Sequence, residues 1–426
     1  MLVEFSVTNY LTFCERQTLS LTAASQIRER SGNSFDTGIK RLPKLNRATV
    51  VYGPNASGKS NLVRALKFMR DFVLNCAQGQ SGEPIPVQAF ELNSRTRTAP
   101  SLFEVVIVQK GIRYQYGFAV NKQRVCHEWL LAYPQGRPQR WFERHLDSAT
   151  GEEQWHLHKK MLPASSGIWK DFTRDNALFL STAVQLNAQV LKPVFDWFSK
   201  SLTVLPPHAE VSVDHAAKLV QDPEGRQRIL SFLNQADLQV DGIHVETRTA
   251  TDKADGEENA HLMNTLQSLL KKKLDGWNWQ ITDITLERRS VDTNHMVRLP
   301  WNTESQGTRK LFALAGPWLD LMAQDRVLVI DELDTSLHHA LVRHLFAALH
   351  KLSGDTHSQL VCTTHDTALL DDKSFRRDQF WMVERTVQRC SHLYPVSEYR
   401  VSLSEPLQKR YLDGHYGGVP DLKKSK

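Results

Sequence analysis

The stretch VVYGPNASGKSNLVRAL, residues 50–66, decides the fold of this chain. It opens as a short apolar run, fits the pattern G-x4-G-K-[ST] at residues 53–60, and ends with apolar side chains at helical spacing. Glycines in such a loop let backbone amides turn towards a phosphate, and the following helix directs its positive end at the same anion. The order strand, loop, helix therefore predicts a phosphate-binding loop in an α/β fold.

The residues of this loop have distinct expected roles. Lys59 supplies a positive charge for the β- and γ-phosphates of a nucleotide, and Ser60 supplies a hydroxyl ligand for Mg²⁺. The predicted nucleotide contacts are Gly53, Asn55, Ala56, Ser57, Gly58, Lys59, Ser60 and Asn61. A coincidental glycine loop is the alternative, and the strand before and the helix after the loop argue against it.

A pair of acids closes a second apolar run, RVLVID at residues 326–331, which is typical of a central parallel strand. Open α/β sheets bind ligands at the carboxyl ends of their strands. We expect Asp331 to hold Mg²⁺, directly or through water, and Glu332 to polarise the attacking water. Two acids alone would fit a solvated strand end equally well. The interpretation as a ligand site is strengthened because the glycine loop is expected in the same sheet.

His365 follows a third apolar run, SQLVCTT at residues 358–364. Parallel pairing of this run with the strand before Glu332 would bring the two strand ends together. A neutral imidazole there would sense the γ-phosphate or orient the water, so we favour a catalytic role over a structural histidine.

Two polar segments permit more than one interpretation. Ser305, Gln306, Gly307 and Thr308 precede a helical pattern, which fits a plain N-cap or a second anion site. Since Lys59 already serves the subunit's own nucleotide, a partner's nucleotide is the more economical target for such a site. Gln185 stands just past an expected strand and, by itself, fits an ordinary loop glutamine.

The rest of the chain reads as further strands and helices. We expect strands near the N-terminus, an antiparallel hairpin that turns at Lys110-Gly111, and a helix over residues 190–202. NALFLSTAVQLN, residues 176–187, is expected to be a strand that ends in a polar turn. Whether Asn9 and Tyr10 read a base is left open by the sequence.

Composition sets broad limits on function. The 426 residues are 41% hydrophobic, which is ample for more than one core. The formal charge of +6 permits nucleic-acid binding without demanding it. The five scattered cysteines suggest neither a disulfide framework nor a zinc site, and they suit a reducing cytosol. No apolar run is long enough for a membrane span and no signal peptide is indicated, so a cytoplasmic protein without a membrane partner is expected.

The order of these motifs resembles ABC-type ATPase heads of the SMC, RecF and OLD kind. The segments that carry the resemblance are GPNASGKS, STAVQ, SQGT, VLVIDELDTSLH and TTHD. They look like the Walker A loop, the Q-loop with Gln185, the signature motif at residues 305–308, the Walker B acids with the D-loop containing Asp334, and the switch histidine His365. The resemblance implies ATP and Mg²⁺ as cofactors, adds Gln185 and Asp334 to the nucleotide contacts, and adds Gln185 to the metal ligands.

A closer resemblance is to stand-alone prokaryotic phage-defence ATPases such as RloA and AbiL, with PARIS and Septu ATPases more distant. It rests on EFSVTNYLTF, LFLSTAVQLN, ESQGTRKLFALA, DQFWMVE and YLDGHYGGVP. It implies an ATPase head with a mixed central sheet flanked by helices, and an antiparallel β subdomain. We expect head segments at residues 1–201 and 301–395, a mainly helical insert at 202–300 in place of a coiled coil, and a C-terminal extension at 396–426.

The resemblance also implies a mode of action. Two heads would pair head-to-tail around ATP, with each signature segment touching the partner's nucleotide. The expected role is a sensor or scaffold that controls an operon-encoded effector, a nuclease or toxin, in antiphage defence. A RecF-like or SMC-like DNA-binding protein in repair is the alternative, disfavoured by the lack of a concentrated basic stripe. The energy subunit of a transporter is a third, disfavoured because SQGT stands where such proteins carry LSGGQ.

Overall fold

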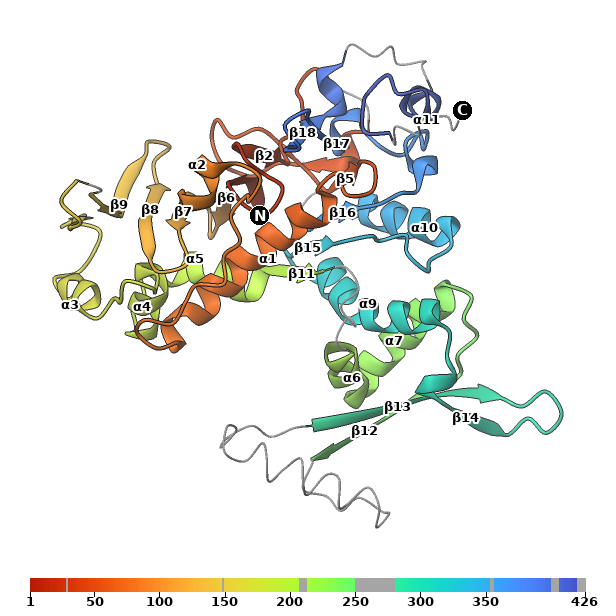
Figure 1. The fold of residues 1–426 in the computed structure, drawn as a ribbon. Helices are drawn as coiled ribbons and strands as arrows, with labels where there is room; N and C mark the ends of the chain where they lie inside the picture. The colour runs from red at the N-terminus through yellow and green to blue at the C-terminus, as the bar shows by residue number, and fades with distance from the viewer. Residues whose placement is uncertain are drawn as a thin grey trace. The chain divides into compact units, whose positions relative to one another are not determined.

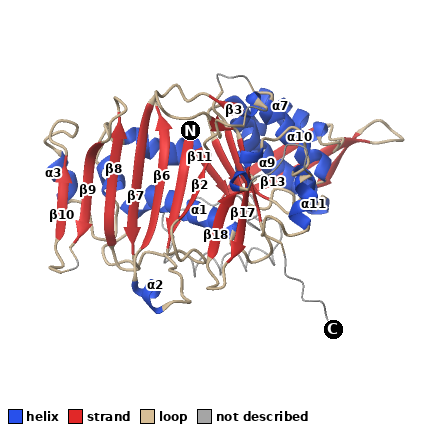
Figure 2. Cartoon of the chain, turned by 90° about the horizontal axis from the view of Figure 1, so that it is seen from above, coloured by secondary structure: helices blue, strands red, loops and turns tan. Residues whose placement is uncertain are grey.

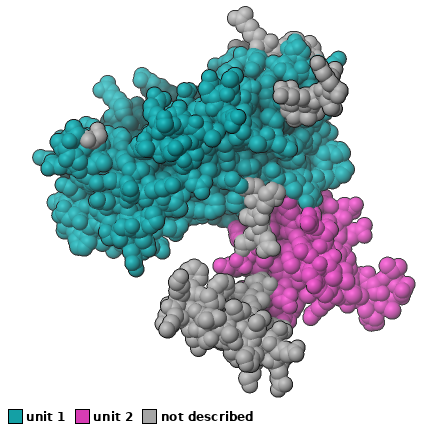
Figure 3. All heavy atoms as spheres, in the orientation of Figure 1, with its two compact units in different colours: residues 1–209, 320–426 teal, residues 210–319 magenta. Residues whose placement is uncertain are grey.

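The structure, a computed structural model, describes residues 1–27, 30–147, 149–206, 213–249, 280–352, 356–399 and 406–419. It comprises two units, residues 1–209 with 320–426, and residues 210–319 (Figure 3). None of the helices in the described residues has both the length and the hydropathy that a membrane span requires.

A six-stranded sheet with the order β11-β15-β16-β5-β17-β18 forms the centre of the first unit (Figure 1). Its strands are β11 (Leu202–Leu205), β15 (Val327–Ile330), β16 (Gln359–Thr363), β5 (Ala48–Tyr52), β17 (Phe380–Arg385) and β18 (Ser391–Pro395). All neighbours are parallel except β17 and β18, and every residue of β5, β15 and β16 is buried. The continuous apolar runs of the sequence therefore form central parallel strands, as predicted.

An antiparallel sheet with the order β10-β9-β8-β7-β6-β1-β2 forms the β subdomain (Figure 2). Its strands are β1 (Leu2–Thr8), β2 (Gln17–Ser20), β6 (Ser101–Gln109), β7 (Ile112–Val120), β8 (Val125–Tyr133), β9 (Gln139–Leu146) and β10 (Glu153–Leu157). The predicted hairpin at Lys110-Gly111 is confirmed. Both turn residues have positive φ, 50° and 73°, which suits the two-residue turns that match strand twist.

The two sheets and the helix α1 (Lys59–Asn75) contribute side chains to one hydrophobic core. Helix α1 contributes Leu66 to a cluster that also contains Phe5 of β1, Phe103 of β6 and Val327 of β15. The other short elements of this unit are β3 (Ser34–Phe35), β4 (Leu45–Asn46), α2 (Ser94–Thr98), α3 (Ser166–Asp171), α5 (Lys192–Asp196), a π-helix (Trp197–Ser201), α10 (His339–His350) and α11 (Leu407–Leu412). The predicted helix over residues 190–202 corresponds to α5 and the π-helix.

The strand predicted for residues 176–187 is wrong, because this segment contains helix α4 (Phe179–Gln185). The backbone amides of Phe179 and Leu180 donate to the carboxylate of Glu128 at 2.7 and 3.0 Å. A buried anion at a helix N-terminus satisfies amides that have no partner within the helix. This tertiary contact outweighs the β-propensity of the segment.

The second unit contains α6 (Asp214–Gln221), α7 (Pro223–Gln235) and the first part of α9 (Gln306–Ala323). It also contains a three-stranded antiparallel sheet of β12 (Gly242–Thr249), β13 (Gln280–Arg289) and β14 (Met296–Pro300). These strands were not predicted within the expected insert at 202–300, and residues 202–205 pair with β15 in the first unit as β11. The part of the expected helical insert at residues 250–279 lies outside the described residues.

A disulfide joins Cys14 and Cys390, so the prediction that the cysteines form no disulfide is wrong. The two residues are 376 positions apart, but their Cα atoms lie 5.6 Å from each other, within the usual range for such bonds. They meet because the Ser391 amide donates to the Thr12 carbonyl oxygen at 2.7 Å, which holds the start of β18 against the loop after β1.

Candidate nucleotide site

The glycine loop lies between β5 and α1, and packing requires glycine at both of its ends. A Cβ atom on Gly53 would lie 2.2 Å from the carbonyl oxygen of Val383 on β17. Gly58 has a φ of 119°, and a Cβ atom there would lie 2.2 Å from Ser391 Oγ. The loop backbone thus fits closely against the β17–β18 hairpin.

Lys59 is directed over this loop. Its side chain is buried, and Nζ donates to the carbonyl oxygens of Gly53 at 2.7 Å and Pro54 at 3.1 Å. Burial lowers the pKa of this ammonium. Three carboxylates act in the opposite direction on its pKa: Asp331, Glu332 and Asp334. The loop lysine and the acids after β15 are therefore close enough to interact electrostatically, as the sequence predicted.

Thr363, the last residue of β16, organises the acid pair. Its hydroxyl donates to Asp331 Oδ1 and accepts a hydrogen bond from the Glu332 amide at 2.7 Å. Glu332 has a φ of 49°, an uncommon conformation for a residue with a side chain, and such conformations concentrate at functional sites. Thr363 is not among the site residues predicted from the sequence; the signal for it is its position at the end of a buried strand, close to His365.

The surroundings of the Asp331 carboxylate are the main structural evidence for a metal-binding site. The residue is only 4% exposed, and its Oδ2 is buried without a hydrogen-bond partner among the described residues. A buried carboxylate oxygen with this property suits a hard cation. Asp331 and the hydroxyl of Ser60 are the residues that would hold Mg²⁺. Among the described residues, no group of three or more His, Cys, Asp or Glu is arranged to hold a metal ion by itself. Phosphate oxygens and water would be the further ligands of Mg²⁺ at Asp331 and Ser60.

His365 joins the same group of side chains. Its backbone amide donates to the Asp334 carboxylate, at 3.1 and 3.3 Å from the two oxygens. Burial and the charge of Lys59 lower the pKa of the imidazole, against the opposing effect of the nearby carboxylates. The lowered pKa favours the neutral imidazole, which is the form that the sequence-based hypothesis requires.

Two predicted groups are not brought to this site by the described contacts. Gln185 is the exposed last residue of α4, and within the described part of the chain its side chain makes no hydrogen bond to the loop. Ser305, Gln306 and Gly307 belong to the second unit, where Ser305 Oγ accepts the Thr308 amide at 3.1 Å and caps α9. Their roles towards a nucleotide remain predictions.

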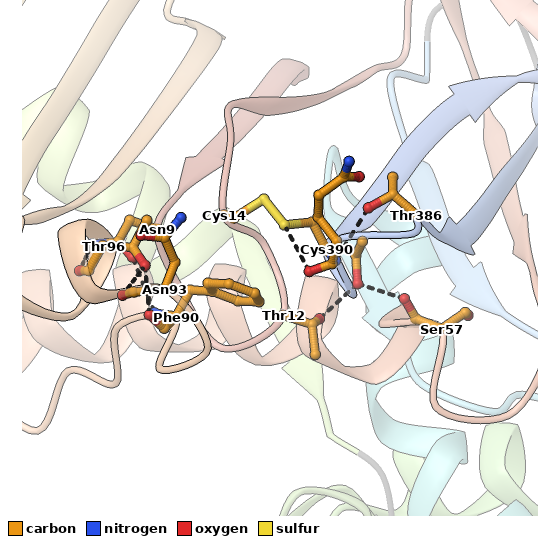
Figure 4. Close-up of a disulfide and its surroundings, with 11 residues drawn as sticks. Asn9, Thr12, Cys14, Ser57, Phe90, Asn93, Thr96, Thr386 and Cys390 are labelled. Carbon is orange, nitrogen blue, oxygen red and sulfur yellow. Dashed lines mark hydrogen bonds between the residues drawn. A yellow bond between two sulfur atoms is a disulfide. The ribbon is translucent and has the colours of Figure 1, made fainter.

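Asn9 and Tyr10, considered as a wall for the base, are engaged inside the protein. The Asn9 amide nitrogen donates to the carbonyl oxygens of Thr96 and Ala99, and its oxygen accepts the Phe90 amide (Figure 4). The Tyr10 ring is 7% exposed and packs against aromatic rings of the core. Both residues therefore support the fold.

The loop between β5 and α1, the acids after β15 and the histidine after β16 define a P-loop NTPase with the α/β architecture of an ABC-type head. The family described as "AAA domain, putative AbiEii toxin, Type IV TA system" matches residues 48–155 and 189–371, about two thirds of the chain. The chain belongs to this family.

The chain is similar to an SMC head domain from Thermotoga maritima, with 15% identity, a TM-score of 0.37, and coverage of 92% of this chain and 98% of that one. It is also similar to an SMC head bound to the C-winged helix domain of ScpA, with 12% identity, a TM-score of 0.41, and coverage of 95% and 98%. No curated protein matches.

Proposed function

We propose that this protein binds and hydrolyses ATP with Mg²⁺, pairs head-to-tail around the nucleotide, and acts as a sensor or scaffold that controls a partner effector in antiphage defence. The observation that carries the ATPase part is the buried Oδ2 of Asp331, which has no hydrogen-bond partner in the described part of the chain and lies within electrostatic reach of the loop ammonium of Lys59. The link to defence rests on the family description, which names a toxin and a toxin–antitoxin system.

The chain's own residues would divide the reaction as follows. Lys59 exchanges the loop carbonyls for oxygens of the β- and γ-phosphates. Thr363 fixes Asp331 and the backbone of Glu332. The Glu332 carboxylate, which also accepts the Thr335 hydroxyl at 3.2 Å, would act as the general base for the attacking water. Neutral His365 orients that water or contacts the γ-phosphate. Bound Mg²⁺ supplies charge neutralisation at the phosphates.

Pairing is the second part of the proposal. Helix α9 begins at Gln306 after the Ser305 cap, and amides in the first turn of a helix bind anions. In a head-to-tail dimer, this helix start would face the γ-phosphate on the partner. The contact would exist only while ATP is intact, so pairing would report the nucleotide state to an effector.

The decisive measurement is the mass in solution of the Glu332→Gln protein, with and without ATP and Mg²⁺, alone and co-expressed with its genomic neighbour. This variant should bind ATP, hydrolyse it about 10²-fold more slowly or worse, and double in mass with nucleotide. Lys59→Ala is the matched control, which should neither bind ATP nor pair. A monomer in every condition would refute pairing, and normal turnover by Glu332→Gln would refute the assigned base.

A DNA-binding role in repair is the second candidate, favoured by the net charge of +6. It predicts a salt-sensitive, ATP-dependent shift of duplex DNA. If the protein binds DNA in this way and recovers no effector from co-expression, the repair role replaces the defence role.

A further inference from the structure

The Cys14–Cys390 disulfide has no part in the proposed hydrolysis, yet it lies beside the nucleotide loop. Figure 4 shows the bond between the loop after β1 and the residue before β18, with Thr12 and Ser57 close by. The next residue after Cys390 is Ser391, which is 1% exposed. Its hydroxyl forms hydrogen bonds with the Ser57 carbonyl oxygen and with Thr12 Oγ1, the latter at 2.7 Å.

These hydroxyls form a chain of hydrogen bonds around the loop. Asn61 Nδ2, in the first turn of α1, donates to Thr12 Oγ1 at 2.9 Å. Because each hydroxyl has a single proton, Thr12 donates to Ser391 and Ser391 donates to the Ser57 carbonyl. The chain therefore begins and ends on the nucleotide loop and its helix, and it passes through the residues next to the disulfide.

The same residues limit where the loop can lie. A Cβ atom on Gly58 would be 2.2 Å from Ser391 Oγ and 2.9 Å from Thr12 Oγ1. Gly58 is the N-cap of α1, so its position sets the direction of the first helical amides. The disulfide joins the two segments that contain Thr12 and Ser391, so it helps to hold in place the side chains against which Gly58 packs.

We propose that Cys14 and Cys390 form a redox-controlled modification site that sets the affinity of the nucleotide loop, an inference that rests on the proposed ATP binding. Cys14 is the accessible partner, since it is partly exposed, whereas Cys390 is 8% exposed. The reductant is a dithiol. Its thiolate attacks Cys14 Sγ, and Cys390 leaves as a thiolate that takes up a proton.

The second thiol of the reductant then attacks the mixed disulfide and releases Cys14, which also takes up a proton. Two electrons and two protons pass to the protein, and the dithiol becomes a disulfide. The oxidised form keeps Thr12 and Ser391 in place before ATP arrives. The reduced form must order them on binding, so its affinity for ATP is about three- to tenfold lower.

The test measures the Kd of a fluorescent ATP analogue with Mg²⁺ for the full chain, oxidised and after treatment with a dithiol. Peptide mass mapping without reduction verifies the Cys14–Cys390 link in the oxidised sample. Cys14→Ser should bind as the reduced protein does in both conditions. The matched control is Cys126→Ser, which removes a partly exposed free cysteine of β8 and should respond like the unaltered chain.

The outcomes distinguish the redox-controlled site from the ATP binding on which it rests. A linked peptide together with the expected rise in Kd on reduction supports the modification site. Absence of the link after oxidation, or an equal Kd in both states, overturns it and leaves ATP binding intact. Failure of every form to bind, with Lys59→Ala indistinguishable from the unaltered chain, overturns ATP binding and the redox inference with it.

Discussion

Replacing Glu128 tests how a buried charge positions the helix that ends at Gln185. Glu128 on β8 is fully buried and forms an ion pair with the equally buried Arg144 on β9, with 3.1 Å between Oε2 and Nε. The same carboxylate accepts the amides of Phe179 and Leu180 at the start of α4. It also accepts the hydroxyl of a buried tyrosine, Tyr116.

Glu128→Ala would remove the buried carboxylate that pairs with Arg144 at 3.1 Å, and it would leave two helix amides inside the protein without their acceptor. Loss of one partner of a buried ion pair costs about 3–5 kcal/mol of the free energy of unfolding. A surface pair is the matched control: Glu91 and Arg97 lie 3.5 Å apart with side chains 60% exposed, and Glu91→Ala should cost about 1 kcal/mol or less.

Urea unfolding followed by tryptophan fluorescence measures the difference, and one of the ten tryptophans, Trp155, has the Arg144 guanidinium over its ring. With a denaturant slope of about 2–3 kcal/mol per molar, the midpoint should fall by about 1–2.5 M in Glu128→Ala. Replacing Glu128 and Arg144 together by methionine should restore the part of that loss that comes from the unpaired Arg144 charge, while the Phe179 and Leu180 amides still lack their acceptor. A midpoint for Glu128→Ala within about 0.3 M of the unaltered protein would refute the reasoning.

Three further predictions concern the site, the fold and pairing. Thr363→Val keeps the shape of the side chain but removes the hydroxyl between Asp331 and the Glu332 amide. The kcat should therefore fall about tenfold or more, while the affinity for ATP is kept. An unchanged kcat, or no recovery of kcat in Thr363→Ser, would contradict this role. Burial lowers the pKa of His350 to about 4, so the unfolded chain binds the extra proton below about pH 6.5, and stability should drop by about 2 kcal/mol from there to about pH 5. Urea unfolding at both pH values should show a smaller drop in His350→Gln, and an identical drop would argue against it. Ser305→Arg should leave ATP binding by the monomer unchanged but abolish the nucleotide-dependent mass increase in the Glu332→Gln background, and a persistent dimer would exclude the signature role.

The parts of the site that were predictable are those whose chemistry is local in sequence. The pattern at residues 53–60 is typical of a turn that starts a helix, and the acids after β15 follow a short apolar run that is typical of a buried strand. Helix α4 was missed because its start depends on Glu128, 51 residues before Phe179. The disulfide was missed because its cysteines are 376 residues apart and meet only through the packing of β18 against the loop after β1. Contacts of that kind leave no periodicity in the sequence.

The glycines of the loop are required for packing as well as for the expected phosphate binding. Gly53 packs against the Val383 carbonyl of β17 and Gly58 against Ser391 of β18, so both ends of the loop are fitted to one hairpin. That hairpin is separated from the loop by more than three hundred residues of sequence, and the packing of the loop against it depends on the pairing of β17 with β5. The motif is consequently constrained twice, by the anion that it is expected to bind and by the hairpin that it contacts. A feature that alters the hairpin, such as the bond at Cys390, therefore acts on the loop without touching the nucleotide.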